Sequence, residues 1–199
     1  SAIPSAPADF AAVLAAELGE RTLIEYAMGE EHLYAFVLQG GSESGAPRLL
    51  DLGARRPIEA LVQEFLAGLT DRATLSTAAQ VARVGGQLHE LLLAPLQLSN
   101  PPVVIVPSGE LARLPFEALV ASAPPGAQRF DQLEFVIDHM DVAYAPSSTA
   151  LLALSRRPPP GRDGLALLLG DPRYASEGEP RLLASRNSAA RSWERLPRS

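Results

Sequence analysis

The chain has 199 residues, of which 47% are hydrophobic and 20% are charged, the proportions of a soluble globular domain. It contains no cysteine and no lysine, so its 17 basic residues are all arginine. These absences exclude thiol nucleophiles, iron–sulfur clusters, cysteine-type zinc sites, P-loop lysines and Schiff-base lysines. No apolar run approaches the ~18–20 residues that a membrane span needs. We therefore expect a cytoplasmic protein with no membrane partner and no cofactor.

The net charge of −6 is unevenly distributed along the chain. Residues 181–199 carry five arginines and one glutamate, which leaves 12 arginines and 22 acidic residues for the rest. An acidic body argues against a broad nucleic-acid surface, because such a surface has to neutralise phosphates. The sequence therefore predicts no nucleic-acid partner.

The first part of the chain predicts a helix followed by an antiparallel meander. Residues 8–19 place apolar side chains at helical spacing and end at Gly19, a typical C-terminal cap. Apolar and polar residues then alternate over residues 22–28 and 33–38 around a Gly-Glu turn, which is typical of a β-hairpin. RLLDLG, residues 48–53, is expected to form a third strand.

Two helices follow the meander. Residues 57–69 begin with a proline and carry an apolar stripe at helical spacing. Residues 74–96 form a second helical pattern, in which Gly85-Gly86 is a candidate kink and Pro95 marks the end.

The second half of the chain contains two strand patterns that are apolar throughout. They are residues 102–107 and GLALLLG from Gly164, and strands buried on both faces imply a mainly parallel sheet between helices. LEFVID (133–138) and MDVAYAP (140–146) are also expected to be strands. Residues 147–155 predict a short helix that either of its first two serines can cap.

The residue types that carry chemistry form no recognisable catalytic arrangement. The histidines at 32, 89 and 139 are scattered and lack metal-ligand spacing, so surface or packing roles are favoured. The sequence GSESG resembles a nucleophile elbow but has Glu43 at its centre. Ser108, Ser147 and Ser148 have no partner base in the sequence pattern and are interpreted as turn and cap residues. No catalytic residue, metal ligand or cofactor site is predicted.

Five ordered blocks of the sequence nevertheless resemble the CHAT domain family, over roughly residues 20–199. A series of blocks in the right order is more specific than any one of them. The blocks are TLIEYAMGEEHLYAFVLQ, LHELLLAPL, VVIVPSGELARLPFEAL, FVIDHMDVAYAPSSTALL and LLLGDPRY.

The resemblance implies a caspase-like and separase-like fold, a three-layer α/β/α sandwich with a mainly parallel central sheet. Such domains are cysteine endopeptidases that use a His-Cys dyad and often accompany tetratricopeptide repeats. In the family both dyad residues follow the position at which this sequence ends, so the fold is expected to be incomplete at its C-terminus. The expected domains are an N-terminal helix or linker (1–20), a supporting pseudo-caspase half (21–160) and the start of the catalytic half (161–199).

The resemblance also selects four charged residues. LLLGDPRY matches a strand whose following loop helps to shape the substrate pocket, so Asp171 and Arg173 are candidate substrate-binding residues, with turn capping and solvent exposure as the alternative reading. Arg195 and Arg198 lie in an arginine-rich segment that is a candidate processing region. An arbitrary fragment boundary or adventitious cleavage is the competing explanation of that end.

Three functional hypotheses remain open at this point. The first is the N-terminal part of a CHAT-type cysteine endopeptidase, inert alone, whose partners are the C-terminal portion with the dyad, a peptide or protein substrate, and tetratricopeptide repeats. The second is a non-enzymatic interaction module attached to such repeats. The third is a small-ligand-binding α/β domain that uses the turns at residues 107–110 and 170–173.

Overall fold

A computed structural model of the chain divides into two units, Ser1–Arg157 and Pro158–Ser199. All the described residues belong to the first unit. The residues that the structure describes are 7–41, 46–70, 77–98 and 102–157.

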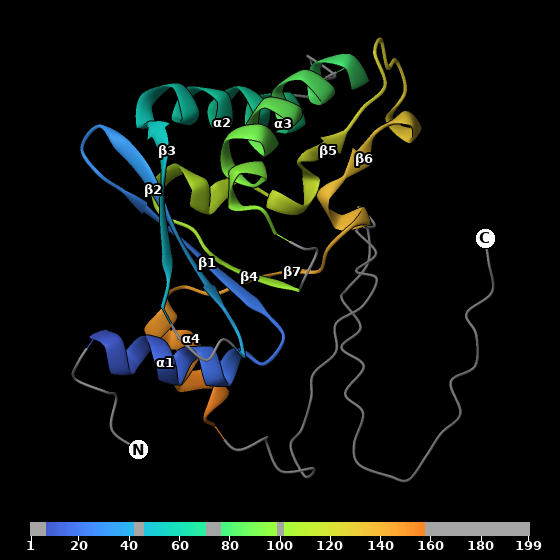
Figure 1. Ribbon diagram of the computed structural model, residues 1–199. Coiled ribbons are helices and arrows are strands. Elements are labelled where there is room, and N and C mark those ends of the chain that lie inside the picture. Colours follow the sequence, from blue (N-terminus) through green and yellow to red (C-terminus); the bar gives the residue numbers. More distant parts are fainter. Residues whose placement is uncertain (1–6, 42–45, 71–76, 99–101, 158–199) are drawn as a thin grey trace, which may run out of the picture. The chain divides into compact units, whose positions relative to one another are not determined.

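The centre of the fold is a mixed five-stranded sheet with the order β3-β2-β1-β4-β7 (Figure 1). Strands β1, β2 and β3 form the expected antiparallel meander, whereas β4 and β7 run parallel to β1. Strand β1 therefore joins the two kinds of pairing within one sheet. The bounds are β1 Thr22–Met28, β2 His32–Gln39, β3 Arg48–Ala54, β4 Val103–Val106 and β7 Val142–Tyr144.

Helices cover both faces of this sheet and complete the predicted α/β/α sandwich (Figure 1). Helices α2 and α3 lie on one face, and α1 and α4 lie on the other. The α/β fold class with a sheet between helices is thus confirmed. The bounds are α1 Pro7–Leu18, α2 Arg55–Thr70, α3 Ala78–Leu92 and α4 Ser148–Ser155.

The two faces of the sheet bury unequal cores, because residues of one strand alternate between them. Ile24 and Tyr26 of β1 join the larger cluster under α2 and α3, whereas Leu23 joins the smaller cluster under α1 and α4. The Tyr26 hydroxyl is fully buried and donates to the Leu92 carbonyl oxygen at 2.9 Å, so the sheet is fastened to the end of α3. Burial raises the pKa of this phenol well above its ordinary value.

The second of the two predicted helices is shorter than its pattern. Thr77 caps α3 by accepting from the Gln80 amide at 3.2 Å, and the helix ends at Leu92. Pro95, which disfavours helical geometry in the residue before it, lies in a separate 3-10 turn. Further 3-10 turns are Gly109–Arg113, Phe116–Ala118, Phe130–Gln132 and Val136–Asp138.

The strand expected at residues 133–138 is shorter in the structure than predicted. Only Glu134–Phe135 is extended, as β6, and it pairs with β5 (Val120–Ser122) in a separate two-stranded sheet. The Asp138 carboxylate accepts from the Phe135 amide at 2.8 Å and so closes a turn in place of a longer ladder. The strand expected from Gly164 lies outside the described residues.

The two glycines of the Gly85-Gly86 pair in α3 differ in their surroundings. A Cβ atom built on Gly85 would lie 3.1 Å from both Phe65 and Val120, whereas one on Gly86 would meet nothing within 4 Å. Gly85 therefore allows α3 to approach α2 and β5 closely, and Gly86 has no such role.

Substitution at these two glycines separates helix propensity from packing. Gly86→Ala is expected to raise the free energy of unfolding by about 1 kcal/mol, because alanine restricts the unfolded backbone and no neighbour is displaced. Gly85→Leu is expected to lower it by about 1–3 kcal/mol through overpacking. Urea unfolding of both variants tests this, and equal effects would contradict the close contact at Gly85.

Candidate functional site

None of the four charged residues selected from the sequence is part of the described structure. Asp171, Arg173, Arg195 and Arg198 all lie outside the described residues, so their expected roles remain predictions.

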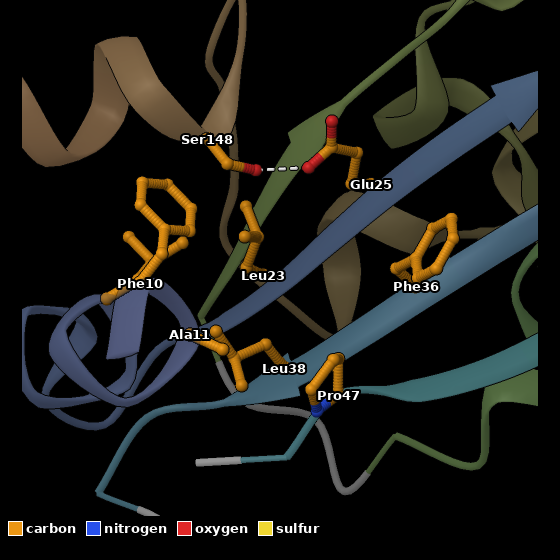
Figure 2. A pocket seen from close by; sticks show the side chains of 9 residues that line it. Phe10, Ala11, Leu23, Glu25, Phe36, Leu38, Pro47 and Ser148 are labelled. Atoms are coloured by element: carbon orange, nitrogen blue, oxygen red, sulfur yellow. Dashed lines mark hydrogen bonds between the residues drawn. The ribbon is translucent and has the colours of Figure 1, made fainter. Parts of the chain in front are cut away.

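A pocket of about 180 Å³ opens on the face of the sheet that α1 and α4 partly cover (Figure 2). Helix α1 forms one wall, strands β1 and β2 form the floor, and the first turn of α4 closes one side. Its lining is apolar except for one carboxylate and one hydroxyl. The lining residues are Phe10, Ala11, Leu14, Leu23, Glu25, Phe36, Leu38, Pro47 and Ser148.

The alternation of β1 places the carboxylate in this pocket. Ile24 and Tyr26 point into the larger core, so Glu25 between them must point to the opposite face. Glu25 is half-buried and accepts a hydrogen bond from the Ser148 hydroxyl (Figure 2). Among the described residues no arginine or histidine forms an ion pair with it.

The two serines at the start of α4 divide two roles between them. The Ser147 side chain accepts from the Ala150 amide at 3.0 Å and is the helix cap. Ser148 is buried and donates to Glu25 instead. The interpretation of Ser147 as a cap is confirmed, whereas Ser148 is a pocket residue that the sequence reading assigned only to capping.

The histidines lie apart from this pocket. His32 pairs with Asp51 at 2.7 Å on the exposed side of the meander, and His139 lies 3.4 Å from Glu134. The Gly53 amide and then His32 lower the pKa of the Asp51 carboxyl. Burial lowers the pKa of His89, and the opposing effect of a neighbouring glutamate does not overcome it.

The turn at residues 107–110 is packed rather than open. Gly109 has a φ of 55°, and a Cβ there would lie 2.4 Å from the Met28 sulfur, so the turn packs directly against the end of β1.

The Tyr144 hydroxyl donates to Glu117 and accepts from the Phe116 amide. Burial, followed by the Glu117 hydrogen bond, raises the pKa of Tyr144. These bonds hold the Phe116–Ala118 turn against the end of β7.

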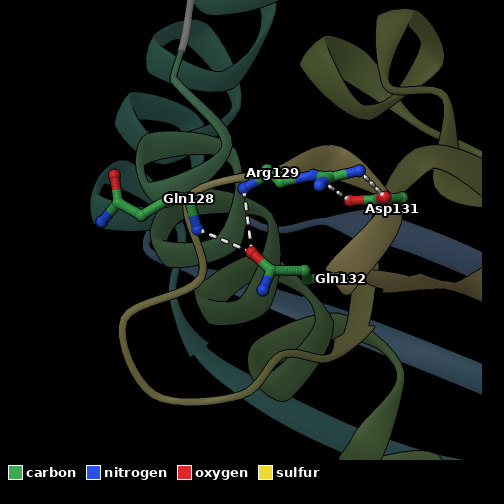
Figure 3. Close-up of polar contacts among 4 residues, drawn as sticks. All are labelled: Gln128, Arg129, Asp131 and Gln132. Carbon is green, nitrogen blue, oxygen red and sulfur yellow. Dashed lines mark hydrogen bonds and ion pairs between the residues drawn. The ribbon is translucent and has the colours of Figure 1, made fainter.

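In another exposed loop, the polar groups bond to residues of the same loop. In the loop before β6, the Gln132 side-chain oxygen accepts from the amides of Gln128 and Arg129, each at 3.0 Å (Figure 3). The Arg129 guanidinium binds Asp131 (Figure 3). This loop therefore presents a closed set of bonds and no free charge for a ligand.

A second hollow, of about 280 Å³, lies around residues 137–141 and Pro102. It is wider open and more polar than the first, and one of its two carboxylates, Asp138, accepts a hydrogen bond from the Phe135 amide.

Within the described ranges no group of three or more acidic or histidine side chains is suited to hold a metal. No helix of the described part is long and apolar enough to cross a membrane.

Glu25 was missed in the sequence because it lies in a regular strand pattern. The available signal was one acidic residue in the middle of TLIEYAM, at a position where both flanking residues are apolar. What the sequence could not supply is Ser148, which lies 123 residues further along the chain.

The different roles of Ser147 and Ser148 can be separated by mutation. Ser147→Ala is expected to lower the free energy of unfolding by about 1 kcal/mol through loss of the α4 cap. Ser148→Ala removes the hydrogen bond to Glu25 and leaves the cap intact. Amide hydrogen exchange at Ala150 is the direct readout: it should accelerate in Ser147→Ala only, and acceleration in both variants would contradict the division of roles.

Comparison with known proteins adds one match. A family model described as the CHAT domain matches residues 82–199, which is more than half of the chain. The matched range begins inside α3 and includes β4, β7 and α4, so Ser148 lies within it and Glu25 lies before it. No curated protein matches the chain.

Proposed function

The chain belongs to the CHAT domain family, and on this premise we propose that it forms the N-terminal, supporting part of a caspase-like cysteine endopeptidase. The family match over residues 82–199 is the observation that carries the proposal. The α/β/α sandwich of the first unit supports it, since a caspase-like domain has the same three layers. The first of the five resembling blocks, residues 22–39, precedes the matched range, and its relation to the family remains a prediction.

The reaction requires residues that this chain does not contain. A cysteine peptidase attacks the scissile carbonyl carbon with a thiolate and expels the amine after a histidine protonates it. Water then hydrolyses the thioester of the acyl-enzyme, which releases the carboxylic acid product and regenerates the thiol. The 199 residues include no cysteine. In the proposal, further polypeptide supplies the His-Cys dyad. This chain supplies the supporting part of the fold, against which that polypeptide packs.

Within this framework two residues contact the substrate in our proposal. Asp171 accepts hydrogen bonds from a basic side chain next to the scissile bond, and Arg173 donates to a substrate carboxylate or carbonyl. Arg195 and Arg198 belong to a segment that is cut during processing. The enzyme acts on peptides or proteins in the cytoplasm and is controlled by attached tetratricopeptide repeats.

The second candidate is an interaction module of the same family without peptidase activity. The 199 residues contain no thiol. A polypeptide in which no cysteine is joined to them would have to be the interaction module. Both candidates share the fold, so only chemistry can distinguish them.

Thiol dependence is the deciding measurement. The 199-residue chain alone should cleave no peptide, whereas the gene product that includes the following polypeptide should cleave one and lose that activity on treatment with iodoacetamide. Because these residues contain no cysteine, alkylation of a thiol can occur only in the added polypeptide. Mass spectrometry of the alkylated site is the control. A longer product with no thiol-dependent cleavage of a diverse peptide library would favour the interaction module.

The proposed role of Asp171 predicts a change in specificity. In the active longer product, Asp171→Asn should lower kcat/KM about 10–100-fold for peptides with arginine before the scissile bond, because a charge-assisted hydrogen bond is lost. Peptides with an uncharged residue at that position should be cleaved as before. An equal loss for both peptide classes would assign Asp171 to the turn rather than to the substrate.

A further inference from the structure

We propose that the pocket at Glu25 and Ser148 binds the guanidinium group of an arginine side chain in a peptide segment of another molecule. This inference concerns binding by the first unit and does not rest on the proposed peptidase function. It starts from a half-buried carboxylate in an apolar pocket that no described cation neutralises.

The size of the pocket limits the ligand to one side chain. Pockets that enclose drug-sized ligands or cofactors span roughly 300–1,000 Å³. The volume of about 180 Å³ is smaller than that range and matches a single long side chain. A nucleotide or a large cofactor is therefore a poor fit.

The charge of the pocket requires a cation. Glu25 is the ionisable group of the lining, and its carboxylate has room for several donors, of which the Ser148 hydroxyl is one. An anionic ligand would be repelled, and a wholly apolar one would remove water from the carboxylate without replacing it. A cation with two or more N–H donors satisfies the carboxylate and offsets its desolvation.

The apolar walls favour arginine over lysine. Phe10 and Phe36 lie on either side of Leu23 in the pocket (Figure 2). Their rings offer surfaces on which a planar guanidinium stacks, and the aliphatic lining suits its methylene stem. An ammonium group is more strongly hydrated and does not stack in this way, so it loses more on entering.

The surroundings of the pocket indicate that the arginine belongs to a peptide. Leu49 is 60% exposed and lies directly opposite Phe36, itself 38% exposed, in the β2–β3 ladder. An apolar surface thus continues from the mouth of the pocket across β3. Residues next to the arginine in a peptide would cover this surface, which free arginine cannot do.

Three arginines on elements around the pocket have partners other than Glu25. Arg21 donates to the carbonyls of Leu18 and Glu17 at the end of α1, and Arg48 donates to the Leu96 carbonyl at 2.6 Å. Arg156 at the end of α4 lies 3.4 Å from the Glu17 carboxylate. None of the ion pairs among the described residues involves Glu25, so these three arginines are not its ligand.

Fluorescence anisotropy with the complete 199-residue chain tests the proposal. The probe is a labelled peptide with one arginine between apolar residues, compared with matched peptides that carry lysine or citrulline in its place. Citrulline has the shape of arginine without its charge, so its peptide should bind at least tenfold more weakly, and the lysine peptide should fall between the two. Equal binding of the arginine and citrulline peptides, or no binding of the arginine peptide at millimolar concentration, would overturn the proposal.

Two variants provide matched controls. Glu25→Gln keeps an acceptor for Ser148 but removes the charge, and should weaken the arginine peptide about tenfold. Glu30→Gln makes the same change in the exposed β1–β2 turn and should leave binding unchanged. Glu25→Gln is also expected to unfold at the same temperature as the parent chain or higher, since it removes an unpaired, half-buried charge. Undiminished binding by Glu25→Gln would overturn the assignment.

A measurement on the unmodified chain keeps the test independent of variant folding. In amide NMR spectra the arginine peptide should shift the signals of Ala11, Leu23 and Ser148 more than those of residues under α2 and α3. The citrulline peptide should leave these three signals in place at the same concentration. Shifts confined to other parts of the chain would place the arginine elsewhere and contradict the proposal.

Discussion

The register of strand β1 is the constraint on which the rest of the structure depends. This strand pairs antiparallel with β2 on one side and parallel with β4 on the other. Its odd and even residues serve different cores, so a slip by one position would move Tyr26 out of the larger core and Glu25 into it. The buried Tyr26 hydrogen bond to Leu92 and the cost of a buried carboxylate both oppose that slip.

Local pattern was sufficient to predict most elements of the fold. The helix ending at Gly19, the meander of residues 22–54 and the helix capped by Ser147 all have signals within a few residues of one another. The segment 133–138 was predicted incorrectly, because its apolar alternation resembles a strand whereas one side-chain bond from Asp138 turns the backbone. Element type follows from periodicity, and a single capping bond can override it.

The pocket was less predictable because its parts are distant in sequence. Its lining combines α1, two strands of the meander and the first turn of α4, and only the three-dimensional arrangement brings Ser148 to Glu25. Histidine, cysteine and metal-ligand spacing are the usual signals of a site in a sequence, whereas this site consists of one carboxylate, one hydroxyl, two phenylalanines and aliphatic residues. These residue types occur throughout most proteins. What distinguishes them here is that Glu25 is half-buried in an apolar pocket and forms no ion pair with a described residue.

Helices α1 and α4 are the first and last elements of the described chain, and the Arg156–Glu17 pair joins them over the smaller core. Polypeptide attached before α1 or after α4 therefore connects to helices that line the pocket, and not to the elements of the larger core on the other face of the sheet. A ligand in the pocket would therefore touch α1 and the first turn of α4, the two elements from which such polypeptide extends.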